Sequence, residues 1–117
     1  MPDFSPRRLA EPCSVRTVPD PPHTHLVLAG EIDIDCRSRL DAVLDEVGDG
    51  PAVDVTTDLS AVTFLGSVGL DFLVQLHLHL VNAGRALTVL NPRPTAGRAI
   101  KLTGLDKLLT VVNDHDA

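Results

Sequence analysis

The chain has 117 residues and a formal net charge of −6, from 10 Lys and Arg against 16 Asp and Glu. This length supports one hydrophobic core, so we expect a single domain. The negative balance lacks the positive surface that nucleic acids and anionic membranes attract, so we expect neither as a partner. Apolar residues make up 44% of the chain, but three Phe and no Trp or Tyr leave aliphatic side chains to build the core.

Two features bear on membranes and on the cellular compartment. No apolar run approaches the roughly 20 residues that cross a bilayer, and residues 1–12, MPDFSPRRLAEP, lack the apolar centre of a signal peptide. Cys13 and Cys36 fit no metal-ligand spacing, and without a signal peptide we expect two reduced thiols rather than a disulfide. The sequence therefore predicts a cytoplasmic protein without a metal site or a cofactor.

The first part of the chain predicts a hairpin followed by a helix. Residues 1–12 are polar and carry three prolines, so we expect a flexible arm before a domain at residues 13–112. CSVRTV (residues 13–18) and HLVLA (residues 25–29) are typical strands, separated by a turn at PDPPH and closed by Gly30. After EIDID (residues 31–35), an apolar stripe at helical spacing predicts a helix, with Asp35 as its N-cap and Gly48 at its end.

The central stretch, DLSAVTFLGSVGLDFL (residues 58–73), predicts the end of a buried strand (residues 53–58), then a loop (residues 59–66) and a helix that begins at Ser67 and stops at Gly84. Gly66 and Gly69 flank the serine, and positions without Cβ let a chain turn sharply and let another molecule approach. Ser67 would lie at or next to the N-cap, where the helix dipole favours a phosphate. The plain alternative is a serine that only caps the helix.

The faces of this helix follow from a rotation of about 100° per residue. The buried face is predicted to hold Leu70, Leu73, Val74, Leu76, Leu80 and Val81, and the opposite stripe Asp71, Gln75, His79 and Asn82. Val68, Phe72 and Leu78 border the polar stripe, so apolar surface next to Ser67 would suit a protein interface. For Phe72, packing under the preceding loop remains an alternative. His77 falls on the buried face, where we expect a hydrogen-bonded core histidine rather than a base or a metal ligand.

The last part of the chain adds a strand at residues 87–90 and a helix capped by Thr95, with Ala99, Ile100 and Leu102 inward. Gly104 would end that helix, and residues 108–112 would form a strand or a helical turn before a polar tail at residues 113–117. The order of elements predicts an α/β fold with parallel crossovers. We expect a mixed sheet of four to five strands with the helices mainly on one face.

Two stretches resemble a known family. Asp58-Leu59-Ser60, Val62, Phe64 and GSVGL (residues 66–70) are similar to the signature of the STAS domain, the family of bacterial anti-sigma factor antagonists. LVLAGEIDIDCRSRLDAVL (residues 26–44) resembles that family's strand, Gly-Glu-Leu-Asp and helix. The family motif reads Asp-Ser-Ser/Thr-Gly-Leu, and its first serine is phosphorylated by a partner kinase. The resemblance implies that this serine is Ser67, with two departures, because Gly66 replaces the aspartate and Val68 the Ser/Thr.

The resemblance also implies a function and its partners. The chain would bind an anti-sigma factor, which is itself a serine kinase of the histidine-kinase-like ATPase type, and this binding would release a sigma factor. Phosphorylation of Ser67 would end the binding, and a serine phosphatase would restore the unphosphorylated protein. The expected partner-binding residues are Glu31, Asp33, Gly66, Ser67, Val68, Gly69, Asp71 and Phe72. For Glu31, a solvated loop acid is the alternative. The second hypothesis for the whole chain is a STAS adaptor, not phosphorylated, in a lipid-transport ATPase or a signalling complex.

Enzyme motifs are not found. Gly66-Ser67-Val68-Gly69 is not a nucleophile elbow, which requires glycine two positions before the serine, where Leu65 stands. There is neither a Gly-Lys-Ser/Thr phosphate loop nor a dinucleotide fingerprint. We therefore expect a protein that is the substrate and ligand of other proteins rather than a catalyst.

Overall fold

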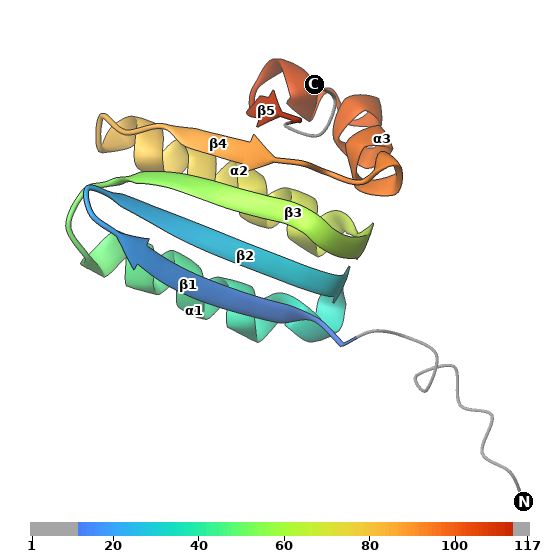
Figure 1. Ribbon diagram of the computed structural model, residues 1–117, viewed down its shortest axis with the longest axis horizontal. Coiled ribbons are helices and arrows are strands. Elements are labelled where there is room, and N and C mark those ends of the chain that lie inside the picture. Colours follow the sequence, from blue (N-terminus) through green and yellow to red (C-terminus); the bar gives the residue numbers. More distant parts are fainter. Residues whose placement is uncertain (1–11, 114–117) are drawn as a thin grey trace, which may run out of the picture.

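A five-stranded sheet forms the centre of the domain in the computed structural model, which describes residues 12–113 (Figure 1). Its strands are β1 (Ser14–Asp20), β2 (His23–Ile32), β3 (Asp54–Leu65), β4 (Leu87–Leu90) and β5 (Thr110–Val112). They lie in the order β1-β2-β3-β4-β5, with β1 antiparallel to β2 and the other pairs parallel. The predicted mixed α/β sheet and the hairpin are thereby confirmed. The predicted arm and tail lie outside the described residues, apart from Pro12 and Asn113.

Three helices connect the parallel strands: α1 (Arg37–Asp49), α2 (Ser67–Asn82) and α3 (Pro94–Leu102). Two short 3₁₀ helices, η2 (Ile34–Cys36) and η3 (Leu105–Lys107), precede α1 and β5. Helices α1 and α2 pack against each other and cover one face of the sheet, as predicted, while α3 contacts β3 (Figure 1). Within residues 12–113, no helix combines the length and apolarity needed to span a bilayer.

The core lies between the sheet and this helical layer. Alternate residues of β2 and β3 are buried because successive side chains of a strand point to opposite faces. The buried apolar set is aliphatic apart from Cys36 and Phe72, and its members on the sheet and on α2 include Leu26, Leu28, Ile32, Val55, Leu59, Val89, Leu73, Leu76 and Leu80. This packing fixes the ends of β2 and β3 against the start of α2.

The predicted loop at residues 59–66 is wrong, because β3 continues to Leu65. Its parallel pairing with β2 persists to the pair Ile32 and Leu65, across register shifts near Gly30. Gly30 has φ +80°, a conformation that glycine adopts without steric cost, so it accommodates an irregularity inside β2 instead of ending the strand. Backbone pairing over this length holds β2 and β3 rigid up to their C-terminal ends, just before α1 and α2.

Helix boundaries agree with the prediction for α2 and differ for α1. Gly84 has φ +73° just after α2, and Gly104 has φ +79° after α3, so both glycines stop helices as expected. The 3₁₀ helix η2 occupies the predicted cap position of Asp35, and α1 runs past Gly48 to Asp49.

Two apolar side chains predicted to face inward lie on the surface, Val81 on α2 and Leu102 on α3. Leucine and valine occur around most of α2, so periodicity alone defines its buried face poorly.

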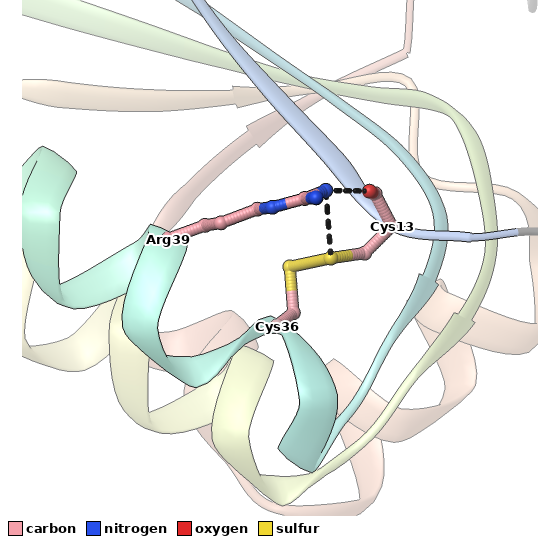
Figure 2. Close-up of a disulfide and its surroundings, with 3 residues drawn as sticks. All are labelled: Cys13, Cys36 and Arg39. Atoms are coloured by element: carbon pink, nitrogen blue, oxygen red, sulfur yellow. Dashed lines mark hydrogen bonds between the residues drawn. A yellow bond between two sulfur atoms is a disulfide. The ribbon is translucent and has the colours of Figure 1, made fainter.

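The predicted pair of reduced thiols is wrong, since Cys13 and Cys36 form a disulfide (Figure 2). Cys13 comes just before β1, and Cys36 is the last residue of η2; their Cα atoms lie 5.9 Å apart although 23 positions separate them in sequence. The hairpin brings β1 beside α1, and this juxtaposition is not visible in the spacing of the cysteines.

Candidate functional site

Ser67 lies where two neighbouring parallel strands end. Strand β3 ends at Leu65, Gly66 forms the junction, and α2 begins at Ser67. The Gly66 N–H donates to the carbonyl oxygen of Ile32 at the end of β2 (2.9 Å), and the Gly66 carbonyl accepts from the N–H of Leu70 (3.0 Å). These two bonds fix the serine backbone against both β2 and α2.

The hydroxyl of Ser67 is available to other molecules. Its side chain is exposed and makes no hydrogen bond with any other residue in the range 12–113. The N-cap of α2 is Gly66, which has no side chain to cap the helix. The alternative of a serine that only caps α2 is therefore wrong. Exposed at the positive end of a helix dipole, the hydroxyl has the setting that favours a phosphate.

Gly66 is covered by two side chains. A Cβ at this position would lie 3.0 Å from Oδ1 of Asp33 and 3.0 Å from Cε2 of Phe64. Asp33 follows β2 and precedes η2, so the acid reaches the junction from the neighbouring strand. The structure thus brings the carboxylate of Asp33, a predicted site residue, against Gly66, the residue just before Ser67.

Three carboxylates surround this junction at the same edge of the sheet: Glu31, Asp33 and Asp71, all exposed. Glu31 pairs with Phe64 across β2 and β3, and Asp71 lies one turn after Ser67 on α2. Between residues 12 and 113 the one ion pair joins His25 and Asp20, 2.9 Å apart at the hairpin end of the sheet. The three acids therefore have no basic side chain of residues 12–113 within ion-pair distance.

Two predicted surface residues point inward. A Cβ on Gly69 would lie 2.4 Å from Cδ1 of Leu65 and 2.9 Å from Cγ2 of Ile32, so α2 approaches the strand ends as closely as the lack of a side chain allows. Phe72 is 2% exposed, so its predicted place on the surface is wrong. The alternative, packing under the preceding loop, is correct about its burial, although that loop is part of strand β3. Val68 is half-buried.

Two apolar residues at the site were missed by sequence reasoning. Ile34 is 63% exposed and Phe64 is 42% exposed, next to Asp33 and Gly66 respectively. Strand alternation would have revealed Phe64, since Leu65 is buried, had the strand been extended through the predicted loop.

The histidine prediction also differs from the structure. His77 is half-buried and its imidazole makes no hydrogen bond within the described part of the chain, so the expected hydrogen-bonded core histidine is wrong. In residues 12–113 no group of three His, Cys, Asp or Glu side chains could hold a metal ion.

This combination defines a class: a small α/β domain whose mixed sheet presents an exposed hydroxyl at the junction of a central strand and a helix. The family model described as "Mlab, STAS domain" matches residues 15–111. The chain belongs to the STAS domain family.

Its relatives include anti-sigma factor antagonists. The anti-sigma-F factor antagonist RsfB of Mycobacterium tuberculosis is 37% identical over 94 residues, 79% of this chain and 75% of RsfB. The crystal structure of an anti-sigma factor antagonist from Mycobacterium paratuberculosis superposes with a TM-score of 0.75 at 32% identity, over 86% of this chain and 85% of that one. The Bacillus cell fate determinant SpoIIAA in its phosphorylated form has a TM-score of 0.67 at 18% identity, over 88% of this chain and 95% of its own, which shows a shared fold.

Proposed function

We propose that this protein is an anti-sigma factor antagonist that binds an anti-sigma factor serine kinase, releases a sigma factor, and is switched off by phosphorylation of Ser67. The observation that carries the proposal is the exposed hydroxyl of Ser67, unbonded among the described residues, at the first position of α2. The names of RsfB and of the M. paratuberculosis protein support the same role. The proposal places the protein in the cytoplasm and adds a serine phosphatase as a second partner.

The contact region, which we call the Ser67 surface, consists of Glu31, Asp33, Ile34, Phe64, Ser67 and Asp71. Ile34 and Phe64 provide its apolar part, and the three carboxylates provide a negative rim. Apolar anchors inside a charged rim are typical of protein interfaces. The matching partner surface would have an apolar pocket and basic side chains around it.

Phosphorylation would oppose this contact by charge. A phosphoserine adds about −1.5 to −2 charges, here within a rim that already carries three carboxylates with no ion-pair partner among residues 12–113. The dipole of α2 tolerates the phosphate in the free protein. A bound partner would have to desolvate that group among like charges, so affinity falls. SpoIIAA, which has this fold, is known in a phosphorylated form.

The alternative function keeps the surface and drops the switch: an adaptor in a lipid-transport ATPase or a signalling complex. Gly66 favours it, because the family motif has aspartate there and Gly66 is buried under Asp33 and Phe64. Val68, half-buried in place of Ser/Thr, is the second departure.

Pull-downs from a lysate of the native cells distinguish the two functions. Three baits are compared by mass spectrometry: the unmodified protein, Ser67→Glu, and the control Thr95→Glu, which adds the same charge to an exposed residue in the first turn of α3. We expect a serine-kinase ATPase with the unmodified protein and with Thr95→Glu, and its loss with Ser67→Glu. Equal recovery of one other partner by all three baits would establish the adaptor.

Phosphate transfer is tested separately with the purified kinase and ATP. The intact protein should gain about 80 Da, the mass of one phosphoryl group, and Ser67→Ala should gain nothing. A gain that persists in Ser67→Ala would place the acceptor elsewhere and contradict the switch.

A further inference from the structure

The disulfide lies close to the Ser67 surface without being part of it. Cys36 ends η2, three residues after Asp33, and Cys13 joins it from the start of β1 (Figure 2). We infer that Cys13 and Cys36 form a reversible redox site, with Cys13 as the reactive sulfur, whose state determines how firmly the turn at residues 33–36 is held.

The two sulfurs have different surroundings. Cys36 is fully buried, whereas Cys13 is half-buried. Nη1 of Arg39 lies 3.8 Å from Sγ of Cys13 and also donates to the Cys13 carbonyl oxygen (Figure 2). The carbonyl bond does not depend on the sulfur bridge, so it holds the guanidinium beside Cys13 in both redox states. A neighbouring positive charge favours the thiolate, which is the nucleophilic form.

The chemistry balances with a peroxide as oxidant and a dithiol as reductant. The Cys13 thiolate attacks hydrogen peroxide and becomes a sulfenic acid with release of hydroxide; the Cys36 thiol then displaces water and closes the disulfide. Two thiols lose two electrons and two protons, and the peroxide leaves as two water molecules. In reverse, a dithiol thiolate attacks Sγ of Cys13, Cys36 leaves and takes a proton, and the second thiol releases Cys13 as it closes its own disulfide.

The turn at residues 33–36 transmits the state of the bridge. The Cys36 N–H donates to the carbonyl oxygen of Asp33 (2.8 Å), and η2 has no side-chain cap, so the disulfide is the covalent tie at the end of a short turn. Oδ1 of Asp33 in turn faces Gly66, next to Ser67. Reduction leaves the turn without this tie, so residues 33–36 move more freely.

The redox site itself does not depend on the function proposed above. The cytoplasmic setting and the effect of the disulfide on partner binding do depend on that function. In the cytoplasm, disulfides are usually transient and redox-sensing. A loosened Asp33 and Ile34 would have to be ordered again when a partner binds to the Ser67 surface, so the oxidised form is the tighter binder.

Oxidation kinetics test the role of Arg39. The reduced protein, Arg39→Gln and the control Arg37→Gln are treated with hydrogen peroxide, and disulfide closure is followed as a loss of about 2 Da in the intact mass. Arg37 is an exposed arginine of the same helix whose side chain makes no hydrogen bond or ion pair with either cysteine. We expect Arg39→Gln to close severalfold more slowly and Arg37→Gln to match the unmodified protein. Equal rates of disulfide closure in all three proteins would overturn the role assigned to Arg39. Disulfides formed between two molecules, instead of within one, would overturn the redox site itself.

Alkylation by iodoacetamide identifies the reactive sulfur without relying on Arg39→Gln. Native Cys36→Ser, which retains Cys13, should react faster than Cys13→Ser, which retains Cys36. The opposite order would exchange the two roles and contradict the inference.

Amide hydrogen exchange tests the coupling in the oxidised and the dithiothreitol-reduced protein. Labelling times are kept short enough that β4 stays protected in both states, because reduction also lowers the global stability. At those times, exchange at residues 33–36 should rise severalfold on reduction. Unchanged exchange at residues 33–36 would disprove the coupling. None of these three assays needs a partner or Ser67, so their failure would leave the proposed phosphorylation intact.

Discussion

Gly69 determines how closely α2 approaches the strand ends, and Gly69→Ala tests that directly. The added Cβ would meet Leu65 at 2.4 Å and Ile32 at 2.9 Å, and both side chains are buried in the core. Because protein cores are close-packed, neither side chain can yield without displacing its neighbours. Gly97 on α3 is the matched control, since a Cβ there would meet only Cγ of Pro92 at 4.0 Å. The same substitution in two helices thus meets a crowded site and an open one.

The two variants should change stability in opposite directions. In a helix interior, alanine is favoured over glycine by about 1 kcal/mol, so Gly97→Ala should gain about 0.5–1 kcal/mol. Overpacking a buried site costs about 1–3 kcal/mol, and an overlap as deep as that at Gly69 lies at the upper end. After the helix gain is subtracted, Gly69→Ala should lose about 1–2 kcal/mol of unfolding free energy.

Urea unfolding followed by circular dichroism measures both changes. The midpoint should fall for Gly69→Ala and rise for Gly97→Ala with the slope unchanged, because neither variant alters the surface exposed on unfolding. If Gly69→Ala were as stable as Gly97→Ala, α2 would be free to shift from the sheet, and the close packing that positions Ser67 would be refuted.

Three further predictions use the same assay. Reduction of the Cys13–Cys36 bridge should lower the free energy of unfolding by about 3 kcal/mol, the loop-closure value for its 23-residue separation; no change with dithiothreitol would argue against a bridge in the folded protein. Phe72→Ala should lower the free energy of unfolding by about 3–5 kcal/mol, whereas the surface variant Phe64→Ala should lower it by about 1 kcal/mol or less. Phe64→Ala should also lose the partner in a pull-down. Comparable stability losses in the two variants would contradict the burial of Phe72 and the exposure of Phe64. Thr57 is fully buried, and its Oγ1 has no hydrogen-bond partner among residues 12–113. Thr57→Val should therefore raise the free energy of unfolding by about 1 kcal/mol. A lower free energy of unfolding would indicate a partner for that hydroxyl.

Local chemistry made several elements predictable. Gly84 and Gly104 stop helices through positive φ, and the bounds of β4 follow from a short apolar run between a glycine turn and prolines. The junction at Ser67 was also predictable, since the change from strand to helix occurs within a few residues of Gly66.

The features that the sequence did not predict depend on tertiary structure. Strand pairing with β2 converts the expected loop before Gly66 into a strand, and only that pairing determines which side of the strand Phe64 faces. The burial of Phe72 and the exposure of Val81 depend on where α1 and the sheet contact a helix that is apolar on most sides. The cysteine pairing depends on β1 lying beside α1, which no local pattern encodes.

The strand order has a consequence for biosynthesis. Each strand neighbours only the strands before and after it in the chain, so the sheet can grow from one end to the other as the polypeptide emerges from the ribosome. When β3 emerges, β2 is already there to receive it, and no strand must be inserted between two others. The three residues of β5 are added last and pair only with β4, so most of the sheet, including the strands that carry the serine junction, can assemble before translation ends.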